Sequence, residues 1–154
     1  MKPAELIARL GLAPLPGEGG HFRETWRSES GSAILYFLSS DPDSFSAIHR
    51  LPADEIYHFY LGDPVEMLLL HPGGRSETVV LGPDLAAGHE VQRVVPAGAW
   101  QGSRVAPGGS WALLGTTMAP PFRFEEFEAG EREALIAGWP GEAERIRALT
   151  RGGE

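Results

Sequence analysis

Short runs of alternating or continuous apolar residues fill the chain between residues 21 and 118, and Gly, Pro or Asp interrupts them. Runs of this length and punctuation are typical of β-strands. Strands are expected at residues 21–28, 33–39, 45–50, 55–61, 65–70, 76–81, 90–95, 101–105 and 111–118. Many short strands at near-regular spacing predict a β-sandwich or a small barrel.

The two ends of the chain show helical spacing instead. The segment AELIARL, residues 4–10, places Leu6, Ile7 and Leu10 on one face, and Gly11 is a residue that commonly ends a helix. Two short helices are expected near the C-terminus, at residues 131–139 and 141–150. The pattern predicts an all-β fold in one domain spanning residues 1–154, with a core at about residues 18–128 and short helices at both ends.

Composition narrows the range of partners. The net charge is −8 and no basic stripe is visible, which argues against nucleic acid. No apolar run approaches the roughly 20 residues that span a bilayer, so no membrane partner is expected. The chain has no cysteine, which excludes disulfides and thiolate metal sites. The N-terminus lacks the features of a signal peptide, so a cytoplasmic location is expected.

The stretch HRLPADEIYHFYLGD, residues 49–63, concentrates groups that can carry chemistry. Side chains alternate faces along a strand, so Glu55, Tyr57 and Phe59 share one face. His58 falls on the opposite face unless a bulge intervenes. Since His49 can face Glu55 across the hairpin, these two groups form a candidate acid–base pair. A structural hydrogen bond between two buried polar groups is the equally weighted alternative.

The order His49, Leu51, Glu55 and Gly62 resembles the first motif of the cupin superfamily. Further along, PAGAWQ at residues 96–101 resembles the second cupin motif, with its proline and glycine in place. The resemblance also shows two departures. Leu51 stands where a second histidine is usual, and Gln101 stands where the second motif has its histidine ligand.

The match is more specific than to cupins in general, because several separate segments resemble the fifth cupin family. These segments are EGGHFRET at 18–25, ILYFL at 34–38, and residues 45–70, 94–105 and 113–128. His21 departs from the aromatic residue that is more usual there. The family contains small bacterial and eukaryotic proteins of unknown function. The resemblance implies a jelly-roll barrel of the dTDP-sugar 3,5-epimerase type, a ligand cavity inside it and a homodimer.

The departures from the cupin motifs bear on metal binding. Cupin metal sites normally take three histidines and a glutamate, but leucine offers no lone pair and an amide oxygen is a weak ligand for metals that prefer imidazole. No cofactor is therefore expected. Weak or adventitious binding of a divalent metal through His49, Glu55 and Gln101 is the alternative.

The candidate site follows from these placements. The catalytic candidates are His49, Glu55 and Tyr57, with His49 as base and Glu55 or Tyr57 completing proton transfer. The candidate ligand-binding residues are Gln101, Tyr36, Phe59, Trp100 and Arg23. Aromatic walls suit sugar rings, and an inward arginine would suit a carboxylate or phosphate.

Three functions stay open on the sequence. The first is a metal-independent epimerase or isomerase acting on a carbohydrate or a nucleotide-sugar-like ligand. The second is a non-catalytic cupin that binds a small polar metabolite. The third is a divalent-metal-dependent oxygenase or isomerase, which Leu51 and Gln101 disfavour.

Overall fold

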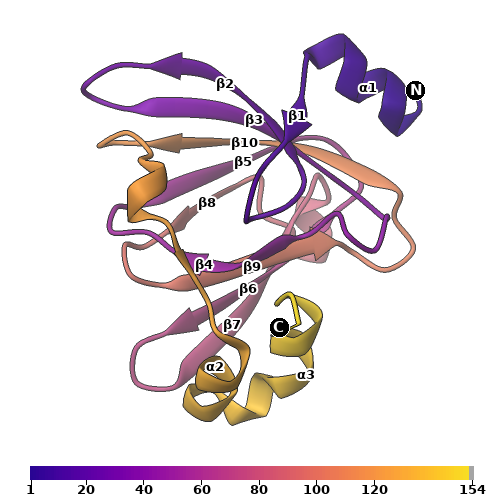
Figure 1. Ribbon diagram of the computed structural model, residues 1–154. Coiled ribbons are helices and arrows are strands. Elements are labelled where there is room, and N and C mark those ends of the chain that lie inside the picture. Colours follow the sequence, from indigo (N-terminus) through magenta and orange to yellow (C-terminus); the bar gives the residue numbers. More distant parts are fainter. Residues whose placement is uncertain (153–154) are drawn as a thin grey trace.

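Two antiparallel β-sheets face each other in the computed structural model, which describes residues 1–152 (Figure 1). The six-stranded sheet has the order β1 (Ala13–Pro14), β2 (His21–Arg27), β3 (Ser32–Ser39), β10 (Trp111–Met118), β5 (Glu55–Gly62) and β8 (Gln92–Val95). The five-stranded sheet has the order β11 (Glu128–Ala129), β4 (Ser46–Arg50), β9 (Trp100–Val105), β6 (Val65–His71) and β7 (Arg75–Leu81).

Helices occupy the ends of the chain, as their spacing predicts. They are α1 (Pro3–Leu10), α2 (Arg132–Gly138) and α3 (Ala143–Ala148), and the short 3₁₀ turns are η1 (Leu85–Ala87), η2 (Phe124–Glu126) and η3 (Pro140–Glu142). Helix α1 begins with a proline in its first turn and ends at Gly11, whose φ of 66° is left-handed. Within residues 1–152, no helix is long and apolar enough to cross a membrane.

The helices cover the outer faces of the sheets. Leu6 of α1 packs with Phe37 and Leu113 on the outside of the six-stranded sheet. On the other side of the molecule, α2 and α3 lie below the five-stranded sheet (Figure 1). There Leu135 and Ile146 pack against Ile48, Leu68 and Leu70.

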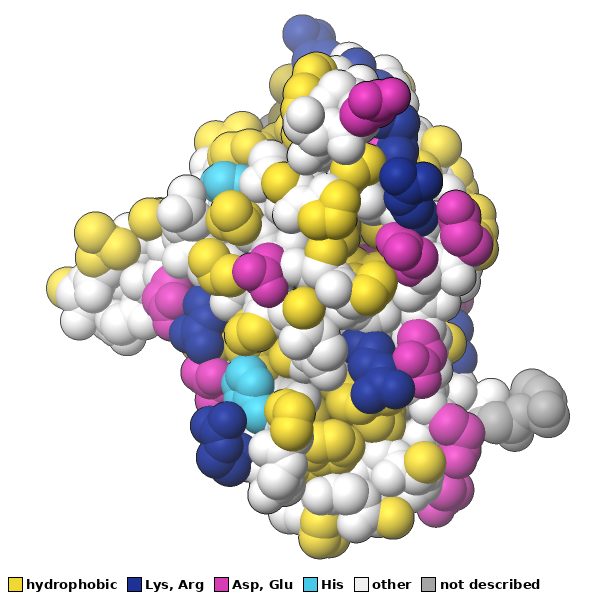
Figure 2. All heavy atoms as spheres, turned by 90° about the vertical axis from the view of Figure 1, so that its left-hand side faces the viewer, with side chains coloured by type: hydrophobic (Ala, Val, Ile, Leu, Met, Phe, Trp, Pro, Cys, Tyr) yellow, Lys and Arg dark blue, Asp and Glu magenta, His cyan; other side chains and the backbone are white. Residues whose placement is uncertain are grey.

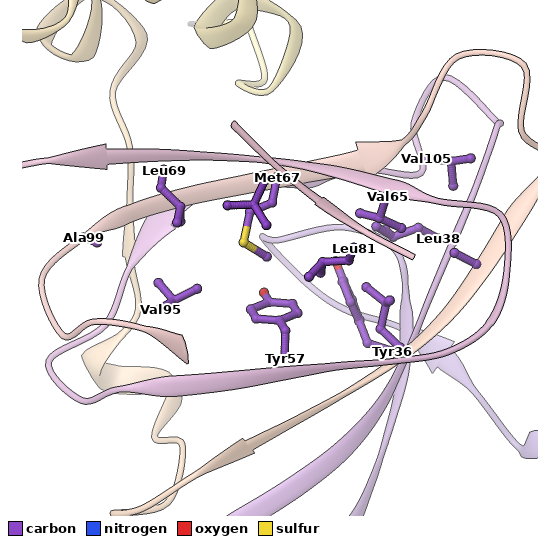
Figure 3. Packing of buried hydrophobic residues seen from close by; sticks show 13 residues of the cluster. Tyr36, Leu38, Tyr57, Val65, Met67, Leu69, Leu81, Val95, Ala99 and Val105 are labelled. Carbon is purple, nitrogen blue, oxygen red and sulfur yellow. The ribbon is translucent and has the colours of Figure 1, made fainter. Parts of the chain in front are cut away.

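The main core lies between the two sheets (Figure 3). It combines aliphatic side chains of β6, such as Met67 and Leu69, with Tyr36 and Tyr57 from the six-stranded sheet. Met67 and Leu69 are wholly buried, and burial of a side chain of this size stabilises a fold by about 1.5–3 kcal/mol. Figure 3 shows both tyrosines projecting from their sheet toward the opposite one.

The structure confirms the expected all-β jelly roll, with the difference that its two sheets are not closed into a barrel. The six-stranded sheet ends at β1 and β8, and the five-stranded sheet ends at β11 and β7. A short ion pair between Arg93 of β8 and Glu77 of β7, 2.8 Å long, links two of these edges. The fold is a jelly-roll sandwich.

One segment, residues 119–131, connects the two sheets across an end of the sandwich and is called the covering segment below. It runs from the end of β10 through η2 and β11 to α2. In Figure 1 it descends on the left, in orange. Ser32 and Arg27 hold its upper part by hydrogen bonds to Phe122, and β11 pairs with β4 at its lower part.

Candidate functional site

Polar side chains are buried between the sheets on the side that the covering segment crosses. They come from a loop and from five strands that are distant in sequence. They are Glu18 of the loop at 15–20, Tyr36 of β3, Ser46 and His49 of β4, Glu55 and Tyr57 of β5, Gln101 and Ser103 of β9, and Thr116 of β10. Buried polar groups cost free energy unless they are paired, so their concentration in one place indicates a built site.

Gln101 joins two of these residues across the sandwich. The Tyr57 hydroxyl donates to Oε1 of Gln101 at 2.7 Å, and Nε2 of Gln101 donates to Oε1 of Glu55 at 3.0 Å. The tyrosine hydroxyl and the carboxylate oxygen together fix which way the amide points, because only the amide nitrogen can donate. Each end of the Gln101 amide therefore has a protein partner.

Glu18 joins a second group of polar side chains. Its Oε2 accepts a 2.8 Å hydrogen bond from the Ser46 hydroxyl, and its Oε1 lies 3.7 Å from Nε2 of His49. Nδ1 of His49 lies 2.8 Å from the carbonyl oxygen of Ala47. A carbonyl oxygen can only accept, so Nδ1 carries the hydrogen and Nε2 is the nitrogen that can gain or lose a proton.

The covering segment shields His49 from solvent. The ring of Phe127 stacks on the imidazole with 4.9 Å between ring centroids, and His49 is only 1% exposed. β11 places Phe127 there, because Ala129 pairs with His49 in the sheet. Figure 2 views this end of the molecule and shows hydrophobic side chains mixed with acidic and basic ones over it.

Electrostatics set Glu55 apart from an ordinary surface carboxylate. Burial raises the pKa of Glu55 from its ordinary value of 4.5, and the negative charge of Glu18 raises it further. His49 and hydrogen bonds from Thr116 and Gln101 act in the opposite direction without cancelling the rise. The protonated acid is thereby favoured at Glu55 over a wider pH range than for an exposed glutamate.

The two tyrosines stay protonated for a related reason. Burial raises the pKa of Tyr36 and of Tyr57 well above 10, and nearby glutamates add to the effect. Both hydroxyls are hydrogen-bond donors, Tyr57 to Gln101 and Tyr36 to the carbonyl oxygen of Gly19 at 2.6 Å.

A cavity of about 40 Å³ lies beside these groups. Its polar lining is Glu18, Glu24, Ser32, Tyr36, Glu55, Tyr57 and Thr116. Its apolar lining is Leu15, Phe22, Ile34, Leu51, Met118 and Phe122. Since a single buried water needs roughly 10–15 Å³, this space accommodates a few water-sized groups, and a larger ligand requires the covering segment to move.

A larger hollow of about 650 Å³ lies outside the sandwich, between α1 and the turns at 15–20 and 39–44. It is open to solvent, and none of the buried carboxylates lines it. Because the convergent polar groups and the raised pKa values belong to the interior cavity, that cavity is the candidate site.

The loop at 15–20 brings Glu18 into the interior. The carbonyl oxygen of Glu18 accepts a hydrogen bond from the Ala47 amide at 2.9 Å. The amide of the following residue, Gly19, donates to the carbonyl oxygen of Leu15 at 3.0 Å. Gly19 has a φ of 108°, which a residue with a side chain rarely adopts. A Cβ at this position would press on the carbonyl oxygen of Phe45. The backbone here thus depends on glycine.

The structure brings together most of the residues that the sequence predicts for the site. Tyr36, Glu55 and Tyr57 line the cavity. His49 and Gln101 do not line it, but each contacts a residue that does, through Glu18 and through Glu55 respectively. Phe59 packs against the core beside them instead of forming part of the cavity wall.

Two residues expected to bind the ligand lie away from the cavity in the structure. Trp100 packs on the outer side of the five-stranded sheet under the guanidinium of Arg50, at 4.4 Å. Arg23 is exposed and pairs in register with Leu35, which faces α1. Strand alternation explains both positions. Gln101, the neighbour of Trp100, and Glu24, the neighbour of Arg23, are the residues that face inward.

His58 points away from the cavity, as its spacing from Glu55 predicts. Its Nε2 lies 3.0 Å from the Thr117 hydroxyl, and its ring stacks on Tyr60, with 6.2 Å between ring centroids. The bulge in the pairing of β5 with β10 falls between Leu113 and Leu114, beyond His58, so it leaves the alternation there intact.

Sequence reasoning missed four residues of the site: Glu18, Ser46, Ser103 and Thr116. A glutamate in a loop of Gly and Pro residues is ordinarily exposed. The available signal was that Glu18 begins EGGHFRET, the first segment that resembles the family. Ser103 and Thr116 occupy inward positions of strands whose alternation could have indicated them, whereas Ser46 faces inward because the pairing of β4 with β9 is irregular between Ser46 and His49.

The donor groups do not fit the metal that the cupin motifs imply. Leu51 has no donor atom, and both ends of the Gln101 amide are already engaged by Tyr57 and Glu55. Within residues 1–152, no group of three or more His, Cys, Asp or Glu side chains is arranged to hold a metal ion. The chemistry proposed for this site therefore uses no metal ion.

A jelly-roll sandwich with a polar cavity between its sheets defines the class: a cupin-fold protein. More particularly, the chain belongs to the family described as "Cupin superfamily (DUF985)", whose sequence model matches residues 4–130.

Relatives share this fold over nearly the whole chain. Protein SO0799 from Shewanella oneidensis is 33% identical with a TM-score of 0.91, and the match covers 99% of each chain. A hypothetical protein from Leishmania major is 26% identical with a TM-score of 0.89, covering 99% of this chain and 100% of that one. The uncharacterized protein YML079W of Saccharomyces cerevisiae is 25% identical, over 86% of this chain and 79% of its own length.

A more distant likeness extends to enzymes of the same fold. Oxalate decarboxylase from Bacillus subtilis aligns with a TM-score of 0.60 and 17% identity, over 93% of this chain and 38% of the enzyme. At this identity the likeness shows the fold alone.

Proposed function

We propose that the protein binds a small polar molecule in the interior cavity and catalyses metal-independent proton transfer on it, as an epimerase or isomerase of a carbohydrate or a related hydroxyl-bearing compound. One observation carries the proposal. Two carboxyl groups, those of Glu18 and Glu55, line the same cavity in different surroundings. Paired titratable groups with contrasting environments are the usual arrangement for an acid and a base.

Glu55 is the proton donor in this proposal. Burial and the charge of Glu18 raise the pKa of Glu55, so its carboxyl group holds a proton longer than an exposed one. Gln101 donates to Oε1, so the proton of the carboxylic acid belongs on Oε2. A carboxylic acid with a pKa closer to neutrality is a more effective general acid near pH 7.

Glu18 and His49 act together as the base. Glu18 lines the cavity, so its carboxylate contacts the ligand directly. Nε2 of His49 lies 3.7 Å from Oε1 of Glu18. Glu18 removes a proton from a carbon next to a carbonyl group while Glu55 protonates the carbonyl oxygen. Protonated Glu18 then returns its proton to carbon while the Glu55 carboxylate takes one back from an enol hydroxyl; return to the other face of the same carbon gives an epimer, and return to the neighbouring carbon gives an isomer. His49 therefore supports Glu18 as the base, whereas the sequence predicts that His49 itself is the base.

Tyr57 acts as a positioning residue. Its hydroxyl is committed to Gln101 at 2.7 Å, and through that contact it orients the amide that binds Glu55. The raised pKa of Tyr57 keeps the hydroxyl protonated, so the contact persists across the neutral pH range.

The size of the cavity favours a small ligand over a nucleotide sugar. With about 40 Å³ of space, a sugar ring already requires movement of Phe122 and the covering segment. A nucleotide portion would have to lie outside the sandwich.

A non-catalytic metabolite-binding protein is the second candidate function, and one observation favours it. Tyr57, Gln101 and Glu55 form a hydrogen-bonded chain in which the polar groups already satisfy one another. Such a chain also suits a rigid binding wall.

The test is a thermal-shift screen of sugars and polar metabolites, followed by NMR of each hit in D₂O with catalytic amounts of protein. Catalysis predicts incorporation of deuterium at one carbon of the ligand and the appearance of an epimer or isomer. Glu55→Gln keeps the volume and removes the acid, so we expect it to slow exchange by about 100-fold or more. Binding without exchange would support the metabolite-binding candidate. A screen in which no compound binds would refute both candidate functions.

A further inference from the structure

The cavity lining carries carboxylates and no basic side chain to balance them. Glu18, Glu24 and Glu55 line the cavity, whereas no Lys or Arg of residues 1–152 does. Arg27 neutralises Glu24 through two hydrogen bonds of 2.9 and 2.8 Å. Neither Glu18 nor Glu55 has a side-chain ion pair with a described Lys or Arg: His49 lies 3.7 Å from Glu18, and Arg151 donates only to the carbonyl oxygen of Glu18, at 3.3 Å. The interior therefore favours positive charge and opposes a second negative one.

Aromatic rings complete the lining. Phe22, Tyr36, Tyr57 and Phe122 contribute to the same wall as the carboxylates. The face of an aromatic ring carries partial negative charge and attracts cations. Aromatic rings combined with carboxylates are a common way for proteins to hold an organic ammonium group.

A buried hydroxyl supplies an independent observation. Ser103 is 1% exposed, and its Oγ has no hydrogen-bond partner among the described residues. It lies two residues after Gln101 on β9, so strand alternation directs it into the interior beside Ser46, its pairing partner on β4, although Ser103 does not line the cavity itself. An unpaired buried hydroxyl offers lone pairs to a ligand N–H or a hydrogen to a ligand hydroxyl.

We infer that the ligand of this cavity is a small hydroxyl-bearing amine, bound as its ammonium cation by Glu18 and Glu55, and that the cavity discriminates against carboxylate and phosphate compounds. This inference rests on the proposed binding of a small polar molecule in the cavity and goes beyond it by assigning the charge of the ligand; it belongs with the metabolite-binding candidate, because an ammonium group that ionises Glu55 removes the proton that catalysis needs. It also excludes the anionic nucleotide sugars among the ligands considered from the sequence.

Proton linkage follows from the same geometry. Glu55 faces Glu18 from the loop, His49 from β4, Tyr57 from its own strand, Tyr36 from β3 and the uncharged Gln101 and Thr116. An ammonium group favours the ionised form of Glu55, whose pKa is raised in the free protein. Binding of a cation therefore releases a proton, and affinity for it increases as pH rises through that pKa.

The experiment compares three probes of nearly equal size: ethanolamine, ethylene glycol and glycolate. They share a two-carbon skeleton with one hydroxyl and end in an ammonium, a hydroxyl or a carboxylate. Glucosamine, glucose and glucose 6-phosphate repeat the comparison on a larger skeleton. Affinities are measured by NMR titration of the whole protein at pH 7, and proton release by calorimetry in two buffers of different ionisation enthalpy.

We expect each amine to bind at least tenfold more tightly than its neutral counterpart, with proton release, and the anions to bind most weakly. Glu18→Gln and Glu55→Gln keep the side-chain volume, so each is expected to abolish the preference for the amine while leaving the neutral probe bound. The control is Glu66→Gln, which removes an outward carboxylate near Arg104 and is expected to change nothing.

Three results would overturn the inference. Equal binding of amine and neutral probe, or tighter binding of the anion, would refute the charge assignment and leave the proposed function standing. Absence of binding by all six probes would count against the site itself and so refute both. Circular dichroism melting of each variant establishes that the fold is retained.

Discussion

At the scale of single residues, the proposed function depends on a few side chains whose surroundings change how readily they hold a proton. Glu55 is the main example, because burial and Glu18 oppose its negative charge. The folded protein therefore holds its proton to a higher pH than the unfolded chain does. Linkage turns this difference into a dependence of stability on pH.

We predict that Glu55→Gln becomes progressively more stable than the wild type as pH rises above 4.5, the ordinary glutamate value. Above that value the unfolded chain ionises Glu55 while the folded chain does not, so the wild type loses stability until pH passes the raised pKa. Each tenfold change in the acid dissociation constant corresponds to about 1.4 kcal/mol. Guanidinium unfolding of both proteins from pH 4 to pH 8 measures the difference, and a constant difference would contradict the prediction.

Tyr57→Phe tests the hydrogen-bonded chain through Gln101. The change removes a 2.7 Å hydrogen bond and leaves Oε1 of a buried amide without that donor. An unsatisfied buried acceptor costs about 1–3 kcal/mol, so the free energy of unfolding is expected to fall by that amount. Tyr60→Phe is the matched control, since Tyr60 is half exposed, and a similar loss in both variants would show that Gln101 does not need Tyr57.

The sequence predicted this polar centre only in part. Glu55, Tyr57 and Gln101 could be placed because strand alternation and motif spacing both apply to them. Glu18 could not, since its inward position depends on a loop whose path is set by contacts with Ala47 and Phe45. The aromatic ring of Trp100 would suit a ligand wall, but alternation along β9 sends it outward beside the inward Gln101.

At the scale of elements, local patterns predicted the helices and long strands well. The strands expected at 33–39, 65–70 and 111–118 differ from the observed ones by a residue or less at each end. The strands β1 and β11 were missed because two residues are too few to show alternation. β1 pairs with the nearby β2, whereas β11 pairs with β4, which is distant in sequence, so only the folded chain identifies that pairing.

The loop at 15–20 gives a prediction at this scale. Gly19→Ala adds a Cβ against the carbonyl oxygen of Phe45 at a φ of 108°. Gly17→Ala is the matched control, because Gly17 also has a left-handed φ, 78°, but nothing lies near its Cβ. Both changes incur a strain of about 1–2 kcal/mol, and Gly19→Ala is expected to cost more and to displace Glu18.

Thermal melting measures the stability of the two variants, and titration with the best-binding probe measures their affinity. Lower stability and weaker binding in Gly19→Ala than in Gly17→Ala would support the role of the loop. Equal effects would show that the loop adapts and that Glu18 does not depend on it.

At the scale of the whole molecule, the six-stranded sheet has an outer face that α1 covers only in part. Beyond α1 this face carries Trp26, Ile56 and Val94, and Tyr60 lies further along β5. Trp26, Tyr60 and Val94 are each about half exposed, at 52%, 49% and 47%. Exposed apolar groups gathered on one face mark a contact surface.

We propose that a second copy of the chain covers this face in a homodimer, the association that the family resemblance implies. An isologous contact would place each patch against its counterpart. Light scattering coupled to size exclusion is expected to give twice the 16.6 kDa mass of the chain. Val94→Lys should shift the protein toward the monomer, whereas Glu66→Lys on the opposite sheet should not, and a monomeric wild type would contradict the proposal.

The most direct test of the account is an NMR titration that follows the side-chain amide of Gln101 while ethanolamine or glucosamine is added. This amide lies between Tyr57 and Glu55, so a ligand in the cavity must change its chemical shift. We predict a saturable shift of the Gln101 Nε2 signals, together with the backbone signals of residues 18–20, and its loss in Glu55→Gln. Saturable binding that shifts only surface residues and leaves Gln101 unchanged would contradict the claim that the interior of the sandwich is the binding site.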